Sequence, residues 1–183
     1  HEAEMREFAD FLFAELLAGA NQNRAWVEAA RNTFIGVLRT IVDCFPDADT
    51  GSWTLVNALR RMPTEDLLAY IAKHPRNHSM LRKDWGYDPS SAKPYIPTRR
   101  ATDIQFFLNQ VLETFSGSFE LDGDDTLHDW LNGRYGQNLF FLYDLRSAEI
   151  SRPFFLYYLK KIKDHQMSSA GKRSAPILMV LDE

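Results

Sequence analysis

Cysteine is scarce in this sequence, with one among 183 residues, and the five histidines are scattered along it. The lone Cys44 excludes an internal disulfide, and its place on an apolar helical stripe predicts packing rather than nucleophilic chemistry. His74 and His78 have the spacing of metal ligands on a helix, but Pro75 lies between them and breaks that geometry. The composition therefore argues against a disulfide framework and a structural metal, and it fits reducing, cytosolic surroundings.

Long hydrophobic runs are missing as well. No segment has the length of a membrane-spanning helix, and none has the pattern of a signal peptide. The net charge of −4 argues against a protein that coats nucleic acid indiscriminately, although it permits a local basic patch. Hydrophobic residues make up 45% of the chain and aromatic residues 13%, which is enough for a buried core. The length suits one domain, or two small parts that share a core.

Helical periodicity dominates the first two thirds of the chain, where apolar residues recur every three or four positions. Long amphipathic helices are predicted over residues 5–19, 23–44 and 98–116. Shorter helices are predicted over residues 52–59, 63–72 and 127–131. Glycine and three prolines predict a long ordered loop over residues 85–97, with one helical turn before it.

The pattern changes after residue 120. Asn138–Tyr143 and Ile177–Leu181 are apolar runs of strand length, and buried parallel strands have such runs. Between them, Ser151 and Pro153 are expected to open a helix that continues through Lys163. A strand, a helix and a strand predict a right-handed crossover in a parallel sheet. The predicted fold class is mainly α, with an all-α block inserted in a partial α/β core.

Charged side chains follow both predicted strands. Asp182 and Glu183 end the second one, at the sheet edge where ligands bind in open α/β folds. The first acid can hold the shell of Mg²⁺, and the second can polarise an attacking water. Asp144 and Arg146 follow the first strand, where Asp144 can contact a nucleotide and Arg146 can reach a neighbouring subunit's phosphate. The alternatives are acids at a sheet rim, and local ion pairing in a turn.

The loop before the last strand is similar to a phosphate-binding loop, but it departs from that motif. Gln166 stands where the motif requires its first glycine, and Arg173 replaces the hydroxyl residue after Lys172. The loop also precedes a strand, whereas a phosphate loop follows one. A flexible connection is therefore expected here.

Basic and aromatic residues are interleaved between residues 73 and 100. The basic ones are Lys73, Arg76, Arg82, Lys83, Lys93, Arg99 and Arg100. The aromatic ones are Trp85, Tyr87 and Tyr95. Such a mixture can bind single-stranded nucleic acid or a protein, while the alternative is a solvated loop with aromatic side chains packed onto helices. If it is a contact surface, Trp85→Ala and Arg82→Ala should weaken partner binding and leave thermal stability nearly unchanged.

Several features of the chain occur in an order that is distinctive. They are the helix with Phe8, Ala9 and Leu12, the opening of a long helix at Trp26–Arg31, the segment Leu127–Leu131, the strand Leu139–Leu142, the Pro153-led helix, and Leu178–Glu183. Together they resemble type IV secretion coupling proteins, the TraG/TraD-type conjugative ATPases. The resemblance covers essentially the whole chain.

This resemblance implies a RecA-like motor with an all-α domain inserted between its two nucleotide motifs. It implies hexamers at the cytoplasmic face of the bacterial inner membrane that recruit a relaxase–DNA complex, or effector proteins, and move them with ATP. Residues 1–20 then correspond to a motor-core helix, 21–120 to the all-α domain, and 121–183 to part of the RecA-like core. Asp182 and Glu183 correspond to the Walker B acids, with Asp182 supporting Mg²⁺ through water and Glu183 acting as the base.

Parts of the family pattern are missing from this sequence: the Walker A lysine, the membrane helices and the motor strands after Walker B. We therefore expect a monomeric piece of a larger protein that binds no cofactor alone and does not hydrolyse ATP, so robust turnover would contradict this expectation. The all-α block should present residues 73–100 to cargo, and the negative net charge favours protein over DNA. The alternatives are a non-enzymatic helical interaction module, and a different RecA-like or AAA motor with a helical insertion.

Overall fold

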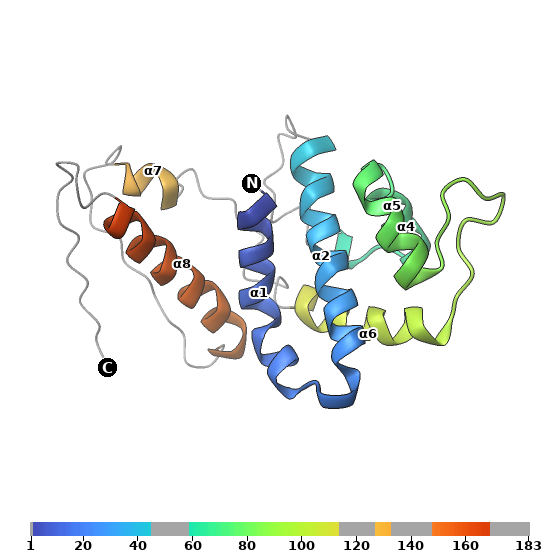
Figure 1. The fold of residues 1–183 in the computed structure, drawn as a ribbon, viewed down its shortest axis with the longest axis horizontal. Helices are drawn as coiled ribbons and strands as arrows, with labels where there is room; N and C mark the ends of the chain where they lie inside the picture. Colours follow the sequence, from blue (N-terminus) through green and yellow to red (C-terminus); the bar gives the residue numbers. More distant parts are fainter. Residues whose placement is uncertain (1, 45–58, 114–126, 133–147, 169–183) are drawn as a thin grey trace. The chain divides into compact units, whose positions relative to one another are not determined.

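The computed structural model describes residues 2–44, 59–113, 127–132 and 148–168 (Figure 1). The chain divides into two compact units, residues 1–122 and 123–183. The helical elements are α1 (Glu2–Gly19), η1 (Asn21–Asn23), α2 (Arg24–Cys44), α4 (Thr64–Ile71), η2 (Pro75–Asn77), α5 (His78–Met80), the π-helical turn η3 (Leu81–Trp85), α6 (Arg99–Glu113), α7 (Leu127–Leu131) and α8 (Ala148–Ser168).

The described ranges contain helices and loops but no β-strand, and their only extended pairing is an isolated antiparallel bridge between Tyr87 and Tyr95. The prediction of a mainly α chain is thereby confirmed. The two predicted strands, at residues 138–143 and 177–181, lie outside the described residues. A RecA-like core therefore stays a prediction.

Helix α2 is the centre of the first unit, and it packs against both α1 and α6. Its predicted apolar stripe is buried from Ala29 to Ile41. Trp26 at its start is half-buried, and Val42 near its end is 39% exposed. Phe34 of this stripe contacts Phe8 and Phe13 of α1, with ring centroids 6.3 and 6.0 Å apart. Each fully buried side chain of this size stabilises the fold by about 2 kcal/mol relative to an exposed one. Helix α1 thus belongs to the core of the first unit, while the assignment of residues 1–20 to a motor core stays a prediction.

The opposite side of α2 contacts α4 and residues near α5, and Gly36 allows their close approach. A Cβ atom at Gly36 would lie 3.1 Å from Met80 Cε and 3.3 Å from Ile71 Cγ2. Helix α4 begins directly after Pro63, as predicted, because a proline suits the start of a helix. Leu68 and Ile71 of α4 are fully buried. A side chain at position 36 would therefore require Met80 and Ile71 to shift by a few tenths of an ångström.

The second unit contains α7 and α8, which contact each other. Helix α7 covers the predicted residues, but α8 is longer than predicted, because it begins at Ala148 and ends at Ser168. Pro153 lies inside α8 rather than opening it. Pro153 is the sixth residue of α8, beyond the first four N–H groups that have no partner within a helix, so it removes one backbone hydrogen bond from the second turn. None of the helices that the structure describes is long and apolar enough to cross a membrane.

Candidate partner-binding surface

Residues 73–100, which we call the basic segment, carry seven lysines and arginines against two aspartates and no glutamate. The whole chain has a net charge of −4, so positive charge is concentrated in this segment. The segment covers η2, α5, η3 and the loop that leads into α6. A local positive field of this kind attracts anionic partners even when the protein as a whole is acidic.

A buried asparagine fixes the start of the basic segment to α2 and α4. Asn77 is completely buried. Its Nδ2 donates to the backbone oxygens of Ile71 (2.9 Å) and Gly36 (3.2 Å) and to Thr40 Oγ1 (3.0 Å). Its Oδ1 accepts a hydrogen bond from Arg39 Nη1 at 2.5 Å. Because buried polar groups are normally hydrogen-bonded, this network holds η2 in place against α2 and α4.

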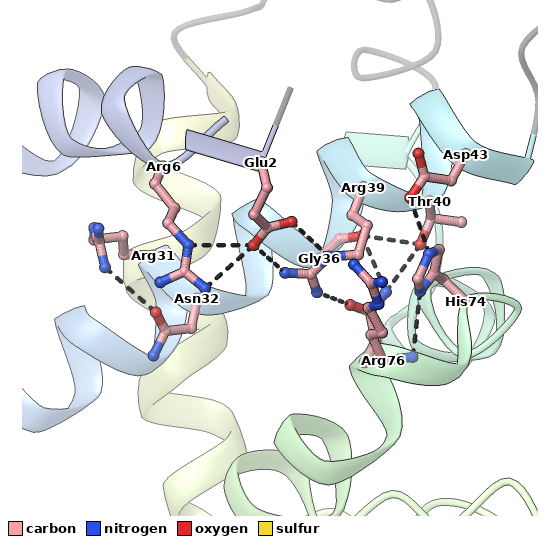
Figure 2. A network of polar contacts seen from close by, with 11 residues as sticks. Glu2, Arg6, Arg31, Asn32, Gly36, Arg39, Thr40, Asp43, His74 and Arg76 are labelled. Atoms are coloured by element: carbon pink, nitrogen blue, oxygen red, sulfur yellow. Dashed lines mark hydrogen bonds and ion pairs between the residues drawn. The ribbon is translucent and has the colours of Figure 1, made fainter. Parts of the chain in front are cut away.

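The same network continues to α1 through an ion pair, and Figure 2 shows its members. Arg39 donates from Nε and Nη2 to the two carboxylate oxygens of Glu2, at 3.0 and 2.6 Å. This hydrogen bonding lowers the pKa of Glu2 to about 2, against the smaller opposing effect of burial, with further help from Arg6. Nearby, His74 Nε2 lies 3.0 Å from Asp43 Oδ2, which joins the basic segment to the last turn of α2.

Trp85 fixes the middle of the basic segment. Its side chain is fully buried, and Nε1 donates to Thr33 Oγ1 on α2 at 2.8 Å. Tyr87 is only 4% exposed, and burial raises the pKa of its phenol. Both side chains therefore belong to the core, as the alternative of aromatic residues packed onto helices predicts, and in this structure neither is exposed to a partner. The spacing of Leu81 and Trp85 gave the missed signal, since residues four apart share one face of a helical turn.

Two arginine–aspartate pairs fold the rest of the basic segment. Arg100 Nη2 lies 2.8 Å from Oδ1 of Asp84, a carboxylate that is nearly buried. Arg82 Nη2 lies 3.2 Å from Oδ1 of Asp88. The first pair joins the beginning of α6 to η3, and the second joins η3 to the loop. Asp84 and Arg100 are thus in contact although they are 16 residues apart in the sequence.

Gly86 completes this corner by adopting a left-handed conformation, with φ of 64°. It ends η3, and a Cβ atom there would lie 3.9 Å from Thr98 Cγ2, so the start of α6 passes directly beside it. Glycine is favoured at such a position because it has no side chain to clash. Helices η3 and α6 contact each other here, which brings two pairs of adjacent predicted site residues to one part of the surface. We call them the cationic corner: Arg82, Lys83, Arg99 and Arg100.

The remaining predicted cations lie nearer the start of the basic segment. Lys73 follows α4, and its ammonium group lies 5.2 Å from the ring centroid of Tyr70, within the range of a cation–π contact. Arg76 lies in η2 and is exposed. Both cations therefore add positive charge to the surface at the start of the basic segment.

The predicted nucleotide-binding residues cannot be placed in the same way. Asp144, Arg146, Asp182 and Glu183 all lie outside the described residues. Within the described ranges, no three histidine, cysteine or acidic side chains come together as metal ligands would. The roles of these four residues therefore stay predictions.

No known protein family, curated protein or solved structure significantly matches this chain. The resemblance to coupling ATPases accordingly rests on the order of motifs in the sequence.

Proposed function

We propose that this chain is the substrate-recognition region of a type IV secretion coupling ATPase, and that its basic segment recruits cargo. The order of motifs supports the choice of protein class. The observation that supports the choice of surface is the cationic corner, in which Arg82, Lys83, Arg99 and Arg100 are exposed side chains on a rigid frame. Cargo in this proposal is a relaxosome protein or a secreted effector, with DNA as the other substrate class.

The frame explains how the surface can recruit a partner without reorganising. Asn77 and Trp85 attach the basic segment to α2 through buried hydrogen bonds, so the exposed cations are held before a partner arrives. Binding then costs less conformational entropy than it would in a flexible loop. Lys83 and Arg99 contribute most to attraction, because in the described part of the chain neither has a side-chain ion pair.

The energy source of the proposed transport rests on the resemblance alone. In that proposal Asp182 and Glu183 serve Mg²⁺ and ATP in a hexameric parent protein at the cytoplasmic face of the bacterial inner membrane. Mg²⁺ would supply charge neutralisation for phosphoryl transfer. Asp144 and Arg146 would lie beside the nucleotide.

A pull-down with the purified chain tests the recruitment role. We expect relaxosome proteins or an effector to be captured by the natural sequence and lost with Lys83→Ala/Arg99→Ala. The matched control is Arg6→Ala/Arg24→Ala, which removes the same charge from exposed ion pairs on α1 and α2. The proposal would be contradicted if the chain captured no relaxosome protein, no effector and no DNA.

The alternative of a non-enzymatic interaction module is favoured by one observation, the all-helical character of the described residues. It uses the same cationic surface but no nucleotide chemistry. The encoding gene separates the two. A phosphate-loop sequence and membrane helices before residue 1 would favour the motor protein, and their absence would favour the module.

A further inference from the structure

We infer that the cationic corner binds a short acidic segment of a partner protein, and that an apolar side chain of this segment packs on Ile96. This inference deepens the proposed recruitment role and rests on it. Ile96 is 63% exposed, the highest value among the large apolar side chains of the first unit that the structure describes. Its backbone oxygen is 4.0 Å from the position of a Cβ on Gly86, so the backbone of Ile96 passes beside the turn that carries the cationic corner.

The charges at the corner leave room for a partner's carboxylates. Asp84 neutralises Arg100, and Asp88 neutralises Arg82. The side chains of Lys83 and Arg99, by contrast, make no hydrogen bond or ion pair within the described part of the chain. Two uncompensated cations on a small, rigid surface fit the carboxylates of a short peptide. Arginine suits this task because its planar group can donate two parallel hydrogen bonds to one carboxylate.

Nucleic acid fits the same surface less well. Single-stranded nucleic acid is usually held by exposed aromatic side chains on which bases stack, but Trp85 and Tyr87 are buried.

An exposed isoleucine beside cations also favours a peptide. Apolar contact and charge pairing occur together in protein interfaces, where a buried apolar centre is surrounded by a polar rim. Phosphate backbones offer no apolar group that would bury Ile96. The combination of Lys83, Arg99 and Ile96 therefore points to a segment in which acidic and apolar residues alternate.

Fluorescence anisotropy with defined probes tests this inference. The probe is a short fluorescein-labelled peptide of alternating glutamate and leucine, and the comparison probes are its glutamine-for-glutamate version and a labelled thymidine oligonucleotide. We expect the acidic peptide to bind, and Lys83→Ala/Arg99→Ala to weaken it by about tenfold or more. Ile96→Ser should weaken it by about threefold or more, and the glutamine peptide should not bind.

The control Arg6→Ala/Arg24→Ala should change the affinity by less than about twofold, because those exposed charges lie outside the basic segment. Thermal melting should be the same for Lys83→Ala/Arg99→Ala as for the natural sequence, since both side chains are exposed. Equal binding of the glutamine peptide, or an unchanged affinity in the double variant, would overturn the inference.

Tighter binding of the oligonucleotide through Lys83 and Arg99 would overturn it as well and assign the corner to nucleic acid. Failure of the inference is distinguishable from failure of the proposed function. If cargo is captured equally by the natural chain and by the double variant, recruitment stands and the acidic-peptide site is wrong. If the peptide binds at the corner but no cargo is captured, the site stands and the recruitment role is wrong.

Discussion

Asn77 connects two helices to the basic segment through a single side-chain amide. The amide group is fully buried and has four hydrogen-bonding partners, Ile71, Gly36, Thr40 and Arg39. Removing it takes one donor from each of two buried backbone oxygens, which keep a bond from Thr40 Oγ1, and takes an acceptor from Arg39 Nη1. Losing these buried hydrogen bonds costs more than losing an exposed one. The stability of the candidate surface therefore depends on a residue that is not part of that surface.

Asn77→Ala should lower the free energy of unfolding by about 1–3 kcal/mol. The measurement is urea unfolding followed by circular dichroism. Asn32→Ala is the matched control, because Asn32 is exposed and accepts only a 3.4 Å hydrogen bond from Arg31, and it should cost less than about 0.5 kcal/mol. Equal stability of the two variants would show that the network does not hold the segment.

Trp85 reverses an expectation drawn from the sequence. Because its ring is fully buried and donates to Thr33, Trp85→Ala should destabilise the first unit by about 3–5 kcal/mol. Arg82→Ala removes an exposed pair with Asp88 and should cost less than about 1 kcal/mol. Thermal unfolding of the two variants side by side checks this. A Trp85→Ala protein that melts like the natural one would place the ring outside the core.

At the level of helices, the contact between α1 and α2 should depend on pH. Arg39 lowers the pKa of Glu2 from 4.5 to about 2. Because the folded-state pKa is the lower one, the ion pair stabilises the fold above pH 4.5, and this stabilisation is lost as the pH falls from 4.5 to about 2. Its size is about 1 kcal/mol, since the Glu2 side chain is 39% exposed and solvent screens the charges.

Unfolding in urea between pH 5 and pH 2 tests this dependence, with a Glu2→Gln variant for comparison. The natural sequence should lose its stability advantage over Glu2→Gln as the pH falls through the range from 4.5 to about 2. Glu28→Gln is the control, because its exposed pair with Arg24 contributes at most about 0.5 kcal/mol. A stability difference between the natural chain and Glu2→Gln that does not change with pH would contradict the role given to Arg39.

Helices were the part of the fold that the sequence predicted best. The stripe of α2 and the proline before α4 are local signals, and both elements begin within one residue of the predicted position. The start of α8 was misplaced because Ser151 and Pro153 are typical of helix openings, although the helix begins earlier. A local pattern shows a position at which a helix can begin, but it does not show whether the helix extends to residues before that position.

The candidate site was predicted only in part, for a physical reason. The concentration of positive charge between residues 73 and 100 is visible in the sequence. The convergence of Arg82 and Lys83 with Arg99 and Arg100 is not, because it depends on the tight turn at Gly86 and on tertiary contacts. The burial of Trp85 also depends on a partner far away in the sequence, Thr33.

At the scale of the whole molecule, an acidic helical protein carries a small positive surface. The first unit supplies rigidity through α2, and the basic segment supplies charge at the cationic corner. A surface of this kind attracts a partner over several ångströms in low salt and loses that attraction as ions screen it. Recruitment through the cationic corner should therefore weaken with rising salt.

The most direct measurement is the dissociation constant for a relaxosome protein over a range of salt concentrations, for the natural chain and for Lys83→Ala/Arg99→Ala. The account predicts that the natural chain binds most tightly in low salt, and that the double variant binds about tenfold more weakly with a shallower dependence on salt. The same affinity and the same salt dependence in both proteins would contradict the claim that the cationic corner recruits cargo.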